Sequence, residues 1–136
     1  MRYLLAALLL LGTVGLTAPP TLGAEDVVVR GRFTEAGFPT DGGVRIVREG
    51  QRLVLVLDAD FVTKPGPDLA LFLSRRPVAR LGNRDATRDT LRIGDLKRPR
   101  GGQRYPLPAD VDATHYASVI LHSETFSKLW GGADLR

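Results

Sequence analysis

His122 is the side chain best suited to ligand or proton chemistry in this 136-residue chain, which contains no cysteine and one other histidine. It directly follows an apolar run, and Glu124 stands two residues further on, so the two would share one face of an extended strand. Imidazole and carboxylate groups can ligate a metal, and imidazole moves protons near neutral pH. A structural histidine that donates to a backbone carbonyl is the simpler interpretation, and both stay open. His115 lies in the loop sequence DATHY, and nothing in the sequence brings it near His122.

The residue types that the sequence lacks exclude most redox centres. Without cysteine the chain cannot form disulfides, thiolate zinc sites, iron–sulfur clusters or thiolate-ligated haem. The single methionine is Met1, which a cleaved leader would remove, so methionine-ligated haem and blue copper are excluded as well. None of the serines stands in a G-x-S-x-G nucleophile elbow. The sequence therefore predicts no catalytic residue, no metal site and no cofactor, and a protein that is not an enzyme.

Asp58 and Asp60 form a D-x-D pattern where an apolar run ends. Such a pair could begin a metal site, but calcium loops need several further oxygen ligands at fixed spacing. We expect instead a turn that ends the preceding strand.

Arginine dominates the charge pattern. Residues 75–104 contain ten Lys or Arg residues against three aspartates, a net charge of +7. The guanidinium group suits planar, bidentate recognition of phosphate or carboxylate. The candidate anion-binding residues are Arg75, Arg76, Arg98, Arg100 and Arg104. The partner would be an acidic protein, a glycan or a lipid headgroup, while the lack of aromatic residues within the basic stretch speaks against nucleic acid. The alternative is a solvated loop that keeps the protein soluble.

The first 24 residues have the pattern of a secretory signal peptide. Arg2 precedes an unbroken aliphatic run at 4–11, and two prolines and the small residue Ala24 follow. The apolar run is shorter than the roughly 20 residues that a membrane span needs, which argues against an uncleaved anchor. We expect an exported protein, periplasmic or extracellular, whose mature part is one domain at 25–136 without a transmembrane segment.

The elements that must position these residues are strands. Short apolar runs alternate with glycine and proline, and no segment sustains an amphipathic 3.6-residue period over three turns. The expected strands cover 27–33, 44–48, 52–58, 69–73, 90–96, 103–108, 116–121 and 126–130. Glu49 and Gly50 are expected to form a tight turn, and residues 122–125 to connect the last two strands. The pattern predicts an all-β domain, a single antiparallel β-sandwich or a partly open barrel.

The sequence also resembles the DM13 domain family. The runs GPDLALFLS and GGQRYPLPADVDATHYASVILHSETFSKLWGGADL follow the family's order of motifs: G-P-D-L, G-x-Q-x-Y-x-l-P, an aspartate and a tyrosine before S-V-v-I, and a closing F-x-x-x-F-G-x-A-x-L. The matching residues are Gly66, Pro67, Asp68, Leu69, Gly102, Gln103, Tyr105, Pro108, Asp112, Tyr116, Ser118, Val119, Ile120, Phe126, Gly131 or Gly132, Ala133 and Leu135. The front run GRFTEAGFPTDGGVRIV resembles the family's opening strand and turn, so the resemblance covers essentially all of 25–136.

The resemblance implies an extracytoplasmic β-sandwich with a proposed role in electron transfer. That proposal relies on a cysteine directly after the V-v-I-W strand, where this chain has His122, and a histidine of the family's opening turn appears here as Phe38. Imidazole can ligate haem or copper but cannot form a disulfide. Electron transfer without a cofactor would depend on Trp130, Tyr105 or Tyr116, which are also plausible core residues.

Three functions follow from these observations. The preferred one is an exported DM13-like protein that acts as a non-catalytic binding module through its arginine-rich loop. A redox accessory in which His122 ligates a cofactor is an alternative, and a purely structural envelope domain is another.

Overall fold

The computed structural model describes residues 12, 15 and 25–136. The signal peptide predicted at 1–24 therefore lies outside the described residues, apart from the two glycines at 12 and 15. Within 25–136 the regular elements are strands and two short 3₁₀ turns, which confirms the all-β class. No helix in this part of the chain is long and apolar enough to cross a membrane. The elements are β1 (Val27–Glu35), β2 (Thr40–Glu49), β3 (Arg52–Leu57), β4 (Val62–Thr63), β5 (Leu69–Ser74), η1 (Val78–Arg80), β6 (Thr90–Asp95), β7 (Gln103–Pro106), η2 (Ala113–His115), β8 (Ser118–Ser123) and β9 (Lys128–Asp134).

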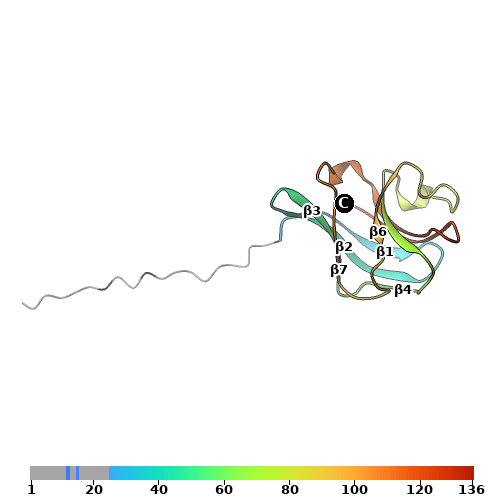
Figure 1. Ribbon diagram of the computed structural model, residues 1–136, viewed down its shortest axis with the longest axis horizontal. Helices are drawn as coiled ribbons and strands as arrows, with labels where there is room; N and C mark the ends of the chain where they lie inside the picture. Colours follow the sequence, from blue (N-terminus) through green and yellow to red (C-terminus); the bar gives the residue numbers. More distant parts are fainter. Residues whose placement is uncertain (1–11, 13–14, 16–24) are drawn as a thin grey trace, which may run out of the picture.

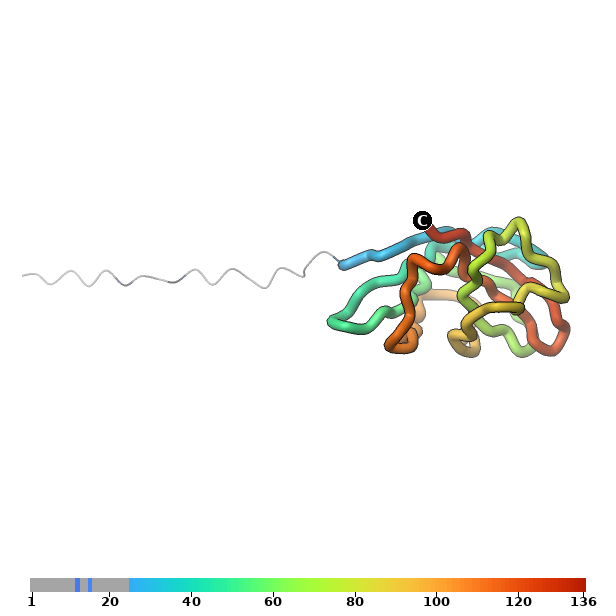
Figure 2. The backbone as a smooth tube through the Cα atoms, turned by 90° about the horizontal axis from the view of Figure 1, so that it is seen from above, coloured from blue at the N-terminus to red at the C-terminus, as the bar shows by residue number. Residues whose placement is uncertain are grey.

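One antiparallel sheet contains these strands in the order β6-β5-β8-β9-β1-β2-β3-β7, with β4 paired to β2 beside this path. The sheet curls until its edge strands, β6 and β7, approach each other (Figures 1 and 2). Between these edges the Lys97 backbone N–H donates to the Tyr105 hydroxyl at 2.9 Å, and Lys97 Nζ donates to the Arg104 carbonyl at 2.6 Å. These hydrogen bonds therefore connect the two edges, which are not paired as neighbouring strands. The result is a nearly closed barrel, the partly open form of the predicted fold.

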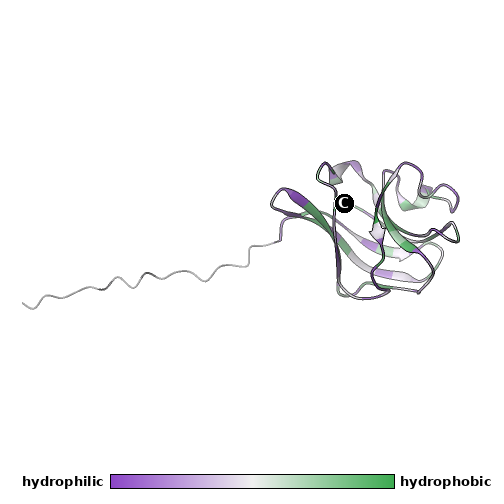
Figure 3. Cartoon of the chain, in the orientation of Figure 1, coloured by the Kyte–Doolittle hydropathy of each residue, from purple (hydrophilic) through white to green (hydrophobic). Residues whose placement is uncertain are grey.

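Strand periodicity divides the apolar residues between an inner and an outer face. In β5, Leu69, Leu71 and Leu73 belong to the main core, whereas Ala70 and Phe72 belong to a second cluster on the outer face. β5 is buried at every position and β3 at every position after its first, as expected for strands covered on both faces. Figure 3 colours these strands largely as hydrophobic.

Residues 75–89, which connect β5 to β6, cover the outer face of β5, β8 and β9. We call them the covering segment; Figure 1 shows them in yellow-green, beside these strands. Ala86 is fully buried and Leu81 half-buried against Phe72, Ile120 and Leu129. The Ser118 hydroxyl donates to the Arg76 carbonyl at 2.7 Å and so fixes the start of the segment on β8.

The antiparallel order brings four connections to one end of the barrel. They are residues 36–39, 58–68, 96–102 and 124–127. We call this end the Phe38 end. The covering segment leaves β5 at the opposite end and folds back along the outer face, so it reaches β8 from the other direction.

Two turns lie at other positions than the sequence predicted. The β2–β3 turn is formed by Gly50 and Gln51, one residue later than expected, and Gly50 adopts a positive φ of 62°. The connection between β8 and β9 covers 124–127, because the pairs Ala70–His122 and Leu69–Ser123 extend β8 by two residues. His122 thus lies inside a strand, and the prediction of His122 in the connection was wrong.

Candidate functional site

His122 lies on the outer face of β8, beneath the covering segment. Its side chain is 5% exposed. The Phe72 ring packs edge-on against the imidazole, with ring centroids 6.1 Å apart and an interplanar angle of 85°. His122 Nε2 lies 3.4 Å from the Asn83 carbonyl oxygen, and Asn83 Oδ1 accepts the Leu129 backbone N–H at 3.0 Å. Asn83 therefore joins the covering segment to both β8 and β9.

The environment of His122 favours the neutral imidazole. Burial lowers the pKa of His122, against smaller opposing effects from the Asn83 carbonyl and from Glu124. A neutral ring that donates from Nε2 to the Asn83 carbonyl leaves Nδ1 as a bare acceptor. Nδ1 is buried and has no hydrogen-bond partner. This arrangement agrees with the structural histidine considered from the sequence, with one ring nitrogen left over.

The residues around His122 do not form a ligand set for a redox metal or haem. The free Nδ1 is a single donor, and Glu124 lies beyond the end of β8, where Arg92 holds its carboxylate at 2.6 Å. The covering segment also closes the site to a group as large as haem. Among the described residues no group of three or more His, Cys, Asp or Glu side chains could hold a metal ion.

Two of the five candidate arginines belong to the covering segment. Arg75 places its guanidinium over the Tyr116 ring, 5.3 Å from the centroid. Arg76 donates to the Asp85 carboxylate at 3.0 Å and to the Asp85 carbonyl at 2.6 Å, and this ties the segment to itself. These two side chains lie at the start of the segment, remote from the Phe38 end.

The other three candidate arginines follow β6. Arg98 and Arg100 lie in the 96–102 connection at the Phe38 end and are exposed. Neither makes an ion pair within residues 25–136; Arg98 donates instead to the Gly102 carbonyl. Arg104, on β7, pairs with Glu49. The structure thus divides the five arginines between two regions, and it leaves Arg98 and Arg100 free of carboxylates.

Gln103 and Tyr105, two residues of the G-x-Q-x-Y motif, hold the 96–102 connection in place. The Tyr105 hydroxyl donates to Gln103 Oε1 at 2.6 Å, and Gln103 Nε2 donates to the Arg98 carbonyl at 2.7 Å. Burial raises the pKa of Tyr105, so its phenol stays neutral and keeps these bonds. The connection borders an open pocket of about 310 Å³, which is lined by residues 65–66, 68–69 and 95–99.

At the Phe38 end, two lysines lie against a pair of packed aromatic rings. Phe38 packs on Trp130 with ring centroids 3.8 Å apart, and the Nζ atoms of Lys64 and Lys128 each lie 4.9 Å from the Phe38 centroid. Trp130 is buried and donates from Nε1 to the Lys64 carbonyl at 2.8 Å. A Cβ at Gly66 would overlap the Trp130 ring, so this glycine of the G-P-D-L motif permits the packing. Among the described residues neither lysine has a carboxylate partner.

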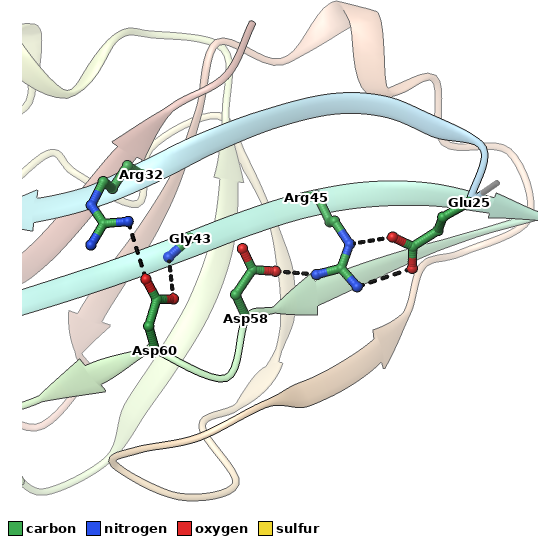
Figure 4. Close-up of polar contacts among 6 residues, drawn as sticks. All are labelled: Glu25, Arg32, Gly43, Arg45, Asp58 and Asp60. Carbon is green, nitrogen blue, oxygen red and sulfur yellow. Dashed lines mark hydrogen bonds and ion pairs between the residues drawn. The ribbon is translucent and has the colours of Figure 1, made fainter.

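Asp58 and Asp60 form the predicted turn, in which the Phe61 N–H donates to the Asp58 carbonyl at 3.0 Å. Figure 4 shows that both carboxylates are occupied by neighbouring groups: Arg45 binds Asp58, and Asp60 accepts the Gly43 N–H at 2.9 Å and Arg32 at 3.1 Å. These contacts, with the Gly43 N–H first, lower the pKa of Asp60. The D-x-D pair therefore forms the turn that ends β3, as expected from the sequence.

Most carboxylates at the Phe38 end are held in the same way. Strand arginines or a hydroxyl bind Asp41, Asp58, Asp60, Asp68, Asp95 and Glu124; Glu35 is the exception. The loop cations Lys64, Lys97, Arg98, Arg100 and Lys128 make no ion pair with any described residue. Arg32 and Arg92 each hold two carboxylates and Arg45 is shared with Glu25, while Asp68 and Glu35 have no cationic partner among the described residues. This end is therefore close to neutral overall, and its five loop cations without an ion pair are a local feature.

Sequence reasoning missed the lysines because they are far apart in the chain. The overlooked signal is that each follows a large apolar residue by two positions: Val62 precedes Lys64, and Phe126 precedes Lys128. These two apolar side chains are 38% and 60% exposed, and they are the exposed large hydrophobics of the described residues.

Comparison with known proteins yields one match. A family model described as electron transfer DM13 matches residues 32–135. The matched range includes His122, Phe38 and the Gln103–Tyr105 pair. No curated protein and no solved structure matches the chain.

Proposed function

The chain belongs to the electron transfer DM13 family, as its motifs predicted, and on this premise we propose that it is an exported, non-catalytic binding module that recognises an anionic partner at the Phe38 end. The observation that carries the proposal is the charge pairing at that end. Arginines of the strands hold five of the seven carboxylates there, and Lys64, Lys97, Arg98, Arg100 and Lys128 form no ion pair with a described residue. An unpaired, exposed cation attracts anions more effectively than one already held by a carboxylate.

The proposal narrows the arginine set read from the sequence. Arg98 and Arg100 are part of the binding surface, with the three lysines added. Arg76 and Arg104 are paired with Asp85 and Glu49, so their charge is already compensated. Arg75 rests on Tyr116 at the start of the covering segment and lies outside the surface.

Chromatography on immobilised heparin, used as a generic polyanion, tests the proposal. The variant Lys64→Gln/Arg98→Gln/Arg100→Gln removes three free cations of the Phe38 end. The control Arg80→Gln/Arg84→Gln/Arg88→Gln removes the same charge from exposed positions of the covering segment. We expect the first variant to elute at clearly lower salt than the control, since contacts with a polyanion weaken with ionic strength. Equal elution of the two variants would show that net charge alone decides retention, and the binding surface would be rejected.

An absorption spectrum separates this proposal from the redox alternative. We expect the purified protein to be transparent in the visible range before and after dithionite. A band that shifts on reduction and disappears in His122→Ala would make His122 a cofactor ligand and overturn the non-catalytic reading.

The proposal of export rests on the N-terminal pattern. Expression in a bacterial host and mass measurement of the protein from the periplasm or medium test it, with an N-terminus at Glu25 as the expected result. Recovery of the intact chain, starting at Met1, from the cytoplasm alone would refute it.

A further inference from the structure

We infer that the anionic partner is a membrane surface, bound through phospholipid headgroups by a patch centred on Phe38. We call the residues Phe38, Val62, Lys64, Phe126 and Lys128 the Phe38 patch. The inference rests on the proposed anion-binding function and names its ligand. It follows from the position of the exposed apolar side chains relative to the free cations.

The two lysines form one cationic site. Because each ammonium group lies 4.9 Å from the centroid of the same ring, the two Nζ atoms are within about 10 Å of each other. Lys64 enters from the end of β4 and Lys128 from the start of β9, and Phe38 lies between them in the 36–39 connection. The backbone N–H groups of Gly37 and Phe38 both donate to the Trp130 carbonyl at 3.0 Å, so the connection that carries the ring is fixed.

Each exposed apolar residue lies two positions before one of these lysines in the chain. Val62 precedes Lys64 and Phe126 precedes Lys128, each by two positions. A single exposed hydrophobic residue on a protein surface needs no explanation. Here, however, each of the two large ones among the described residues is two positions from a lysine without an ion pair. Phe126 is held at the tip of the β8–β9 turn, where its N–H lies 3.4 Å from the Ser123 hydroxyl.

A second cationic group adjoins Val62. Val62 forms an isolated antiparallel bridge with Arg100, and the Thr63 N–H donates to the Pro99 carbonyl at 2.8 Å. These backbone contacts dock the 96–102 connection, with Arg98 and Arg100, against β4. Arg98 and Arg100 therefore lie near Val62, whose neighbours Asp41 and Asp60 are both held by Arg32.

Apolar tips among basic residues distinguish a membrane surface from a soluble polyanion. A soluble acidic glycan gains from the lysines but has no use for Phe126. An anionic bilayer offers both: each Lys or Arg near its surface contributes about 1 kcal/mol, and apolar side chains gain by entering the boundary between headgroups and acyl chains. The Phe38 patch matches this combination without any membrane-spanning helix in the described residues.

Co-sedimentation with vesicles tests the inference. Sucrose-loaded vesicles of phosphatidylcholine alone are compared with vesicles that also contain phosphatidylglycerol, at several salt concentrations. We expect binding to the anionic vesicles only, with a partition coefficient roughly 30-fold lower in Lys64→Gln/Lys128→Gln. Phe126→Ser is expected to lower it roughly tenfold, and Val62→Thr less. The control Arg80→Gln/Arg88→Gln should lose far less than the lysine variant. All variants share one N-terminus, so residues 1–24 cannot explain a difference between them.

The heparin measurement distinguishes the failure of this inference from the failure of the proposed function. If Phe126→Ser changes vesicle binding but not heparin elution, the membrane inference holds. If the Phe38-end cations govern heparin elution while anionic vesicles are not bound, or are bound equally well by Phe126→Ser, the partner is a soluble acidic glycan or protein and the inference is overturned. If neither heparin nor vesicle binding depends on those cations, both proposals fail.

Discussion

The surroundings of His122 and of Phe38 differ in almost every physical respect, although family resemblance connects both positions with polar residues of the DM13 pattern. The covering segment encloses His122, burial keeps the ring neutral, and no second ligand stands beside it. Phe38 lies at an open end of the barrel between two lysines that have no carboxylate partner among the described residues. His122 is therefore part of a packed cluster, whereas Phe38 lies beside cationic side chains.

The difference has a common cause in loop length and direction. The fifteen residues of the covering segment are long enough to fold back over β8 and bury its outer face. The connections at the Phe38 end are short or are pinned by backbone bonds, so they leave the side chains at their tips exposed. The first site is therefore enclosed, whereas the lysines at the second have no carboxylate partner among the described residues.

The largest expected effect is a difference in stability between two phenylalanine variants, one from each region. Phe72 is 6% exposed beneath the covering segment, and Phe126 is 60% exposed at the Phe38 end. We expect Phe72→Ala to lower the free energy of unfolding by about 3 kcal/mol or more, because it leaves a cavity beside His122. Phe126→Ala should change the free energy of unfolding by less than about 0.5 kcal/mol. Urea denaturation measures both, and a similar loss for the two variants would contradict the contrast.

A smaller effect is expected where the covering segment is fastened to the sheet. Asn83→Ala removes the acceptor of the Leu129 N–H, and we expect a loss of about 1 kcal/mol. Asn83→Asp keeps an acceptor oxygen and serves as the matched control. Hydrogen exchange at the Leu129 amide should accelerate in the alanine variant only. Unchanged protection there would mean that the segment is held without Asn83.

The smallest expected effect is a pH dependence of the free energy of unfolding that comes from His122. Because burial lowers the pKa of His122 in the folded state, the unfolded state binds the proton more readily. The free energy of unfolding should therefore decrease as the pH falls below about 6.5, the ordinary histidine pKa, until the folded state is protonated as well. The carboxylates with lowered pKa values, Glu25, Asp60, Asp85 and Asp112, act at lower pH, below about 4.

The variant His122→Gln tests this assignment. It should flatten the slope of stability between about pH 7 and pH 5. A slope that persists in His122→Gln would show that the buried imidazole is not its source.

Much of the fold was readable because strand formation depends on local pattern. The apolar run of 53–57 predicted a strand covered on both faces, and β3 is one. The ordered motifs of the second half predicted the family. The end of β8 was not readable, because the residues around His122 and Ser123 are polar and only pairing with β5 holds them in the strand.

The sequence by itself determined that this protein is an all-β member of the DM13 family with no thiol and a surplus of arginine. It also marked His122 and the basic stretch as the places to inspect. Only the tertiary structure decided that His122 is enclosed, that the five candidate arginines separate into two regions, and that Lys64 and Lys128 meet over Phe38. The physical reason is that burial and charge pairing are properties of contacts between residues far apart in the chain. Residue type and spacing state which groups exist, and the packing of loops onto the barrel decides which of them remain free to act.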